Sequence, residues 1–108
     1  MFLLAPTAHV ALYAGEIEDA REEVRNNPDD AKAHKNLGGA YGYSGKYKEA
    51  IESFKQAIRI DHDYAGARFS LGFTYVNIND RDSALEQYEI LKSLDTERAK
   101  ELFDYIYE

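Results

Sequence analysis

The residues that come nearest to a phosphate-binding loop lie in the glycine-rich stretch 38–46. Such a loop cradles phosphate with backbone N–H groups and ends in Lys followed by Ser or Thr. Here Ala40 stands where the first glycine is needed, and Tyr47 stands at the hydroxyl position. Close packing of helices and the end of a helix explain these glycines better, so the sequence predicts no phosphate site.

Calcium, zinc and acid–base chemistry also lack the residues they need. The stretch 61–66 begins like a calcium loop, but Ala65 and Gly72 stand where oxygen ligands are required. The chain has no cysteine, and its histidines lie far apart with no flanking ligand pattern: His9, His34 and His62. Adjacent acids such as Asp29 and Asp30 are typical of solvated surface. A Ser-His-Asp triad forms only in space and stays open on sequence grounds. We expect no cofactor and no enzymatic activity.

Composition favours one folded domain of the ordinary globular kind. Hydrophobic residues make up 44% and charged residues 31%, enough for a core and a solvated surface. A net charge of -7 repels phosphate backbones, which argues against a nucleic-acid partner. Residues 1–15 are apolar but too short to span a bilayer, and they lack the basic region of a secretory signal. The expected location is therefore the cytoplasm.

An internal repeat organises the rest of the chain. Residues 31–64 align with residues 65–98 at an offset of 34 without a gap. Eight positions are identical: Ala31/Ala65, Ala33/Ala67, Leu37/Leu71, Gly38/Gly72, Tyr41/Tyr75, Ala50/Ala84, Glu52/Glu86 and Asp61/Asp95. Apolar residues recur at helical spacing in both halves of each unit, so each unit is predicted to be two helices.

Helix boundaries are also predicted by residue type. Gly45 and Asn79 occupy equivalent positions between the two helices of each unit, and both types readily adopt the left-handed conformation that ends a helix. Three aspartates precede helical stretches and suit N-caps: Asp30, Asp63 and Asp80. Gly38 and Gly72 are expected on packed faces where two helices approach closely.

Two further segments flank the repeats. Gly15 is followed by Ile17, Ala20 and Val24, as Gly45 is followed by apolar residues, which predicts a degenerate first repeat over 4–28. Its first helix would run from about Leu4 to Ala14, and its second would be cut short by Pro28. The segment 96–108 carries one apolar stripe and is expected to form a helix that caps the stack: Ala99, Leu102, Phe103 and Ile106.

The 34-residue spacing, with Leu-Gly-x-x-Tyr at 37–41 and 71–75 and a later Ala-x-x-x-aromatic, resembles the tetratricopeptide repeat pattern. His34 and Arg68 replace the usual Trp of that family, and His62 and Thr96 replace the usual Pro. The resemblance implies an all-α fold, a right-handed α-solenoid of antiparallel helix pairs. It also implies a concave groove, lined by the first helix of each pair, that holds a peptide or partner segment.

By repeat position, the resemblance places ten residues in this groove: Lys32, Lys35, Asn36, Gly39, Tyr43, Phe69, Ser70, Phe73, Val76 and Asn77. Lys32 and Lys35 share a helix face and suggest an acidic group in the partner, while the two phenylalanines suggest an apolar anchor. The lysines could equally be solvated surface, and the phenylalanines could equally be core. The family's carboxylate clamp needs Asn where Gly39 stands, so that specific function is not expected.

Two functions follow from this sequence. The first is a scaffold or adaptor that binds a protein or peptide in the groove. The alternative is a structural repeat unit that forms homo-oligomers through the apolar edge of an incomplete first repeat, at Phe2, Leu3 and Leu4. The alternative predicts concentration-dependent dimers that are lost when Leu3 and Leu4 become polar.

Overall fold

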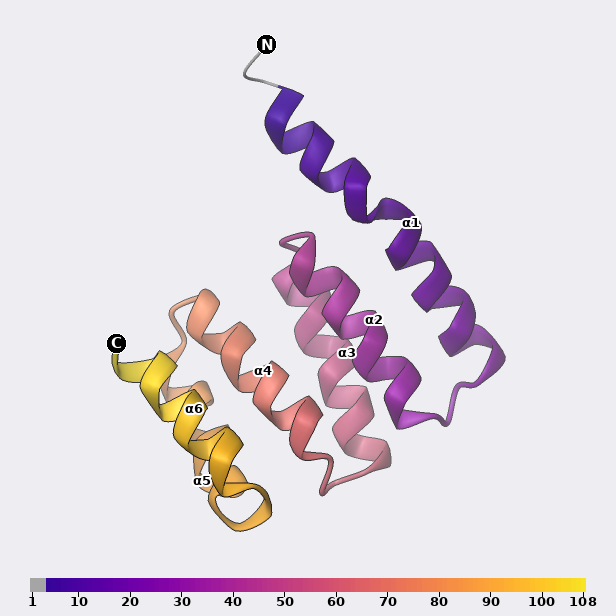
Figure 1. The fold of residues 1–108 in the computed structure, drawn as a ribbon. Coiled ribbons are helices and arrows are strands. Elements are labelled where there is room, and N and C mark those ends of the chain that lie inside the picture. Colours follow the sequence, from indigo (N-terminus) through magenta and orange to yellow (C-terminus); the bar gives the residue numbers. More distant parts are fainter. Residues whose placement is uncertain (1–3) are drawn as a thin grey trace.

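A computed structural model describes the backbone of residues 4–108 and the side chains of residues 14–108. Within residues 4–108 the chain forms helices and no strand: α1 (Leu4–Asn26), α2 (Ala31–Tyr43), α3 (Tyr47–Ile60), α4 (Ala65–Asn77), α5 (Arg81–Leu94) and α6 (Thr96–Tyr107). Both repeats predicted from the sequence are antiparallel helix pairs, α2–α3 and α4–α5 (Figure 1). The expected all-α helical repeat fold is therefore confirmed.

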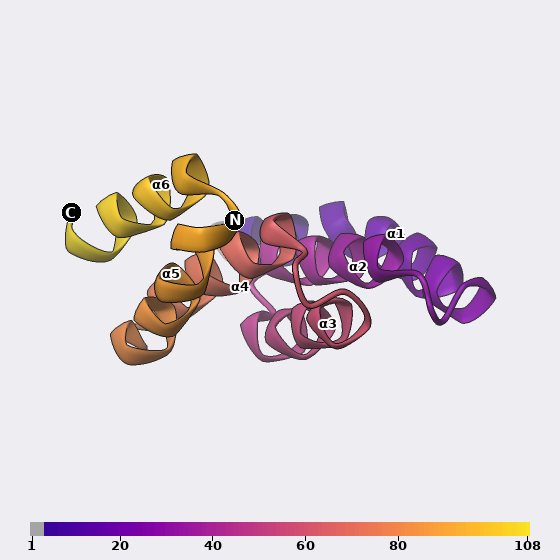
Figure 2. The same cartoon turned by 90° about the horizontal axis from the view of Figure 1, so that it is seen from below.

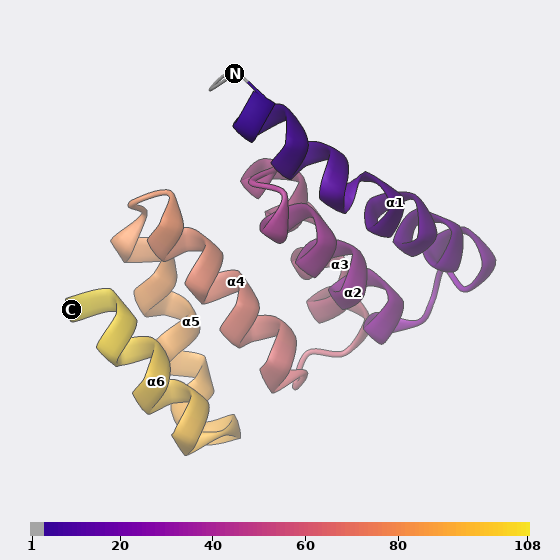
Figure 3. The same cartoon turned by 45° about the horizontal axis from the view of Figure 1, so that its top comes forward.

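The helices form two layers. Figure 2 shows α3 and α5 on one side of the molecule and α1, α2, α4 and α6 on the other. Within the second layer α1 packs on α2, α2 contacts α4, and α4 packs on α6, so these helices run side by side (Figure 3). The shortest dimension of the molecule is 19 Å, which suits two helices each about 10 Å across. The solenoid thus presents a face built from α2, α4 and α6.

The turns between paired helices have the predicted conformation. Gly45 has φ +81° and Asn79 has φ +64°, and the backbone N–H of each donates to a carbonyl at the end of the helix before it. A residue with a Cβ pays a steric cost in this region, which glycine avoids and asparagine tolerates. The 34-residue repeat therefore carries one left-handed residue per unit at equivalent positions.

Two glycines three residues apart should respond in opposite ways to alanine. A Cβ on either Gly42 or Gly45 would meet no atom within 4 Å, so only the backbone decides the outcome. Gly45→Ala should lower the free energy of unfolding by about 1–2 kcal/mol because its φ is positive. Gly42→Ala, inside α2, should raise it by up to about 1 kcal/mol. Urea unfolding measures the free energy of unfolding of both variants. A change of the same sign in both would contradict the prediction.

Aspartates begin three of the helices. Asp30 accepts from the backbone N of Lys32 at 3.0 Å, and Asp80 accepts from that of Ser83 at 3.1 Å, so both predicted N-caps are confirmed. Asp95 caps α6 in the same way.

The predicted cap at Asp63 is wrong. The N-cap residue of α4 is Tyr64, which has no side-chain capping bond. The backbone N of Asp63 instead donates to the Asp61 carboxylate at 3.2 Å, within the turn that precedes α4. The aspartate is one position too early to reach the free N–H groups of the first turn.

Paired glycines let large side chains enter the core. A Cβ on Gly38 would lie 2.6 Å from the Phe54 ring, and one on Gly72 would lie 2.6 Å from a Leu102 methyl. Both glycines are buried, as the repeat predicted. Two clusters of buried residues result, one of Ala50, Phe54 and Leu71, the other of Ala84, Leu91, Ala99, Leu102 and Ile106.

The expected hairpin at Gly15 is absent. α1 is one continuous helix from Leu4 to Asn26, and Gly15 is not left-handed. The second helix is also not cut short, because the repeat offset maps Tyr47–Ile60 onto residues 13–26, which end where α1 ends. Glycine alone does not stop a helix; it must adopt positive φ, as Gly45 does. No helix in the described part of the chain is long and apolar enough to cross a bilayer.

The residues at the family's Trp position fasten the loops that precede their helices. The His34 ring Nε2 lies 2.8 Å from the carbonyl of Pro28, and Arg68 Nε donates to the carbonyl of His62 at 2.9 Å. Pro28 and His62 are equivalent positions at the 34-residue offset. His34, which stands where the family usually has Trp, thus makes a hydrogen bond that fixes the entry of the chain into α2.

Candidate functional site

An aromatic hollow lies where α2, α3 and α4 meet. It has a volume of about 310 Å³ and is lined by Gly39, Gly42, Tyr43, Tyr47, Phe54, Phe69, Ser70, Phe73, Thr74 and Asn77. None of these residues is charged. Tyr43 is 69% exposed and Phe73 is 37% exposed, so aromatic surface here faces solvent. Apolar surface of this kind, rimmed by polar groups, is typical of sites that bind another molecule.

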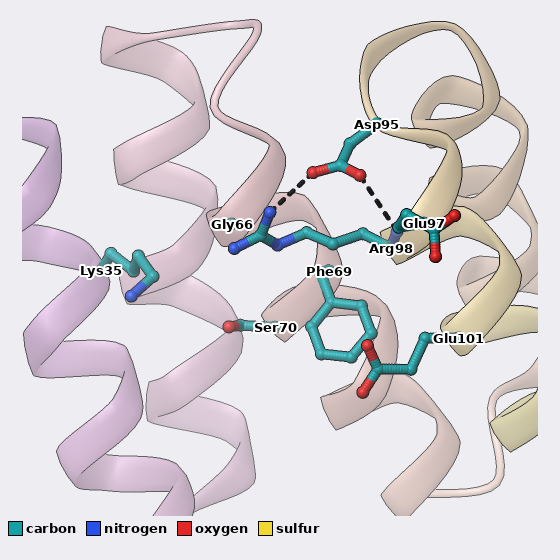
Figure 4. Close-up of a pocket in the computed structure, with 8 residues that line it drawn as sticks. All are labelled: Lys35, Gly66, Phe69, Ser70, Asp95, Glu97, Arg98 and Glu101. Atoms are coloured by element: carbon teal, nitrogen blue, oxygen red, sulfur yellow. Dashed lines mark hydrogen bonds and ion pairs between the residues drawn. The ribbon is translucent and has the colours of Figure 1, made fainter.

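A charged hollow adjoins the aromatic hollow and shares Phe69 and Ser70 with it. Its lining comes from α2, α4 and α6: Lys35, Gly66, Phe69, Ser70, Asp95, Glu97, Arg98 and Glu101. Figure 4 shows Lys35 on the α2 side and Glu101 on the α6 side, with Phe69 and Ser70 of α4 between them. The two hollows together form one groove along α4, which we call the groove below.

Three aromatic rings, those of Phe69, Phe73 and Tyr105, contact one another beside the two hollows and are called the ring wall below. The ring centroids of Phe69 and Phe73 on α4 are 6.4 Å apart, and that of Tyr105 on α6 lies 4.7 Å from Phe73 and 6.4 Å from Phe69. Phe69 is half-buried and packs against the core cluster that contains Leu102. The two phenylalanines therefore differ: Phe69 packs on the core, as one interpretation of the sequence expected, while Phe73 keeps an exposed ring, as a ligand site requires.

The structure places most predicted groove residues in these hollows. Six line the aromatic hollow: Gly39, Tyr43, Phe69, Ser70, Phe73 and Asn77. Lys35 lines the charged hollow, and its Cε would lie 3.3 Å from a Cβ on Gly66, so the bare glycine backbone lets the lysine stem extend over α4. Asn36 lines the adjoining surface between α1 and α2 together with Lys35 and Gly39.

Val76 and Lys32 lie outside the groove. Val76 packs against the core cluster of α5 and α6 and lines a separate hollow with Asn79, Arg81 and Ile106. It is seven residues after Phe69, and the face it shares with that residue turns toward α6 at this end of the helix.

Lys32 lies on the α1 side of α2, in a hollow lined also by Asp19, Glu23 and Asp30. None of the hollows described above is lined by both lysines, so the two do not combine into the predicted basic patch of the groove. The hollow of Lys32 and the charged hollow each have more carboxylates than cations in their lining, counting Lys35 and Arg98 against Asp95, Glu97 and Glu101 in the charged hollow. The surface around the aromatic rings is acidic on balance.

An ion pair at the start of α6 holds one end of the charged hollow. The Asp95 carboxylate accepts from the backbone N of Arg98 at 3.1 Å and from the Arg98 guanidinium at 2.6 Å. The backbone bond, followed by the guanidinium, holds the pKa of Asp95 below its usual value. Asp95 and Arg98 thus neutralise each other and leave Lys35, Glu97 and Glu101 as the other charges of this hollow.

Sequence reasoning missed the residues that α3 and α6 contribute. Tyr47 and Phe54 line the aromatic hollow from α3, and Glu101 and Tyr105 reach the ring wall from α6. The resemblance assigned the groove to the first helix of each pair, and α6 was expected only to cap the core. Because α6 packs beside α4 as a further first helix would, its exposed face could have been included.

No metal-binding group was found among the described side chains. Residues 14–108 contain no cluster of three His, Asp or Glu side chains that could hold an ion. His9 lies outside the described side chains. His34 bonds a backbone carbonyl, as described above.

Part of the repeat region resembles known protein sequences. The TPR repeat family matches residues 40–79. Protein O-mannosyl-transferase Tmtc3 of Drosophila melanogaster is 37% identical over 71 residues, which is 66% of this chain and 8% of that protein. Hsp70-Hsp90 organizing protein 1 of Glycine max is 28% identical over 67 residues, 62% of this chain and 12% of that protein. The chain thus spans a small part of these curated relatives.

Two solved structures share the fold. The TPR2B domain of yeast Sti1, in a structure of its complex with pHsp70, superimposes with a TM-score of 0.82 at 22% identity. That match covers 90% of this chain and 82% of the other. MamA superimposes with a TM-score of 0.71 at 24% identity, covering 83% of this chain and 64% of the other. Both likenesses concern the arrangement of helices.

Proposed function

Because this chain belongs to the tetratricopeptide repeat family, we propose that it binds a segment of another protein in the groove along α4. The observation that carries this proposal is the uncharged aromatic hollow, in which Phe73 and Tyr43 expose ring surface to solvent. Protein–protein contacts draw most of their binding energy from a few such aromatic anchors. An apolar side chain of the partner would fill the hollow.

Two comparisons bear on the kind of partner. The structure of the Sti1 domain holds pHsp70, and that domain has the same helix arrangement as this chain. This supports a peptide segment as ligand, although the identity of that ligand is not carried over at 22% identity. The O-mannosyl-transferases match over 8% of their length, so their activity is not assigned to this chain either. We propose a scaffold or adaptor without catalysis of its own.

Site-specific photo-crosslinking tests the groove directly. Asn77 lines the aromatic hollow, whereas its neighbour Ile78 lines none of the hollows described above although its side chain is 42% exposed. We would replace each in turn by p-benzoylphenylalanine and irradiate both variants in cells. A partner protein crosslinked from position 77 and not from 78 is the expected result.

Both positions are exposed, and they are adjacent at the end of α4, where Asn77 is the last helical residue and Ile78 the C-cap. Equal crosslinking from both positions, or crosslinking only from position 78, would overturn binding in the groove. Mass spectrometry of the crosslinked peptide would identify the bound segment and its residues.

The self-assembly alternative depends on residues that cannot be compared with the structure. Phe2 and Leu3 lie outside the described residues, and the side chain of Leu4 is not described. No observation on residues 14–108 favours this alternative over the groove. It stays a prediction. Analytical ultracentrifugation would test it by comparing the oligomeric state of the wild type with that of a variant in which Leu3 and Leu4 are replaced by polar residues.

A further inference from the structure

Glu101 is the feature of the groove that packing of the fold does not explain. It projects from α6 into the charged hollow, and Figure 4 shows its carboxylate beside the ring of Phe69. Among the described residues it has no hydrogen-bond or ion-pair partner, while its neighbour Asp95 is paired with Arg98 at 2.6 Å. An exposed carboxylate beside aromatic rings is a poor match for a purely apolar ligand.

The helix geometry places this carboxylate at the edge of the ring wall. Glu101 and Tyr105 are four residues apart on α6 and therefore share a face. Tyr105 contacts Phe73 and Phe69 on that face, with centroid distances of 4.7 and 6.4 Å. A side chain that enters here meets ring surface and a negative charge together.

The charges around the ring wall are negative on balance. Asp95 and Arg98 cancel, which leaves Glu97 and Glu101 against Lys35 on the opposite wall of the hollow. The whole chain carries a net charge of -7, so a positive segment is attracted at long range. An acidic segment would find Lys35 there, but it would also meet the carboxylates of Glu97 and Glu101.

We propose that the groove binds a protein segment with an arginine side chain next to its apolar anchor. This inference rests on the function proposed above. The guanidinium plane lies over the ring wall of Phe69 and Tyr105, its edge pairs with Glu101, and the anchor occupies the aromatic hollow beyond Phe73. Arginine fits better than lysine because its planar head can stack on a ring and bind a carboxylate at the same time.

Three probe peptides test this inference. They are N-acetylated, C-amidated octapeptides with Leu and Phe as flanking anchors, identical except for arginine, citrulline or glutamate at one central position. Citrulline keeps the shape of arginine without its charge. Titrated into ¹⁵N-labelled protein, the arginine peptide should bind about three- to tenfold more tightly than the citrulline peptide. It should shift the amide resonances of Phe69, Ser70 and Glu101.

A charge-matched pair of variants completes the experiment. Glu101→Gln should abolish the preference for arginine over citrulline, whereas Glu52→Gln, an exposed glutamate of α3 outside the hollows, should leave it unchanged. A preference that survives Glu101→Gln, or tighter binding of the glutamate peptide, overturns the inference.

Two other outcomes separate this inference from the proposed function. Equal binding of all three peptides, with shifts at groove residues, overturns the role of charge and leaves groove binding standing. No shift at groove residues with any peptide at millimolar concentration overturns the arginine inference, and the crosslinks from position 77 then decide on the groove itself.

Discussion

Replacing Leu102 by alanine is expected to lower the free energy of unfolding by about 3–4 kcal/mol. Leu102 is fully buried, and it packs in the cluster that joins α4, α5 and α6. Its methyl groups occupy the space left by the missing side chain of Gly72. Truncation removes apolar burial and leaves a cavity, and both terms destabilise the fold. Urea unfolding followed by circular dichroism measures the loss.

A second substitution separates cavity formation from a general weakening of α6. Gly72→Ala alone should cost about 1–3 kcal/mol, because its new methyl would lie 2.6 Å from a Leu102 methyl. In the Leu102→Ala background the same methyl would enter the cavity, so the double variant should cost less than the sum of the single variants. Additive losses within about 0.5 kcal/mol would contradict this packing account. Ile90→Ala, at an exposed site of α5, is the control with little expected loss.

The sequence predicted those parts of the fold that depend on local spacing. The 34-residue offset located four helices, because it fixed equivalent apolar residues and one left-handed residue per unit. Gly45 and Asn79 have the expected positive φ. α1 was predicted less well, because Gly15 has the residue type of a helix end without its conformation. A residue type permits positive φ, and packing of the returning helix decides whether the residue adopts it.

The sequence predicted which types of residue line the groove better than it predicted where each side chain lies. Lys32 and Lys35 lie three positions apart and share a helix face in the sense of a helical wheel. That face is divided between two neighbours, because α1 packs on one side of α2 and α4 lies on the other. Lys32 therefore lines a hollow beside α1, whereas Lys35 reaches the charged hollow beside α4 as well as the surface toward α1.

The role of α6 shows the same limit. Its apolar stripe predicted a helix that covers the core, and Leu102 and Ile106 are buried as expected. The sequence predicted no contacts for Glu101 and Tyr105 on the exposed face of α6, since these contacts depend on where α6 lies relative to α4. Position along the stack makes α6 a wall of the groove, so one helix both covers the core and supplies Glu101 to the candidate site.

Replacing Phe73 by alanine should weaken binding of the crosslinked partner segment by about 30-fold or more, which corresponds to about 2 kcal/mol. Phe73 is the exposed ring between the aromatic hollow and the ring of Tyr105, and it is 37% exposed. Truncation would remove the contact surface of the anchor while most of the core stays intact. Isothermal titration calorimetry with the segment identified from position 77 measures the change.

Phe103 provides the matched control for this prediction. It is also a phenylalanine, it is 42% exposed, and it packs between two rings, those of Tyr88 at 5.3 Å and Tyr107 at 4.7 Å. It lines none of the hollows described above. Phe103→Ala should therefore cost about as much stability as Phe73→Ala and leave the affinity unchanged. An equal loss of affinity in both variants would show that destabilised helices, and not a missing anchor, explain the weaker binding.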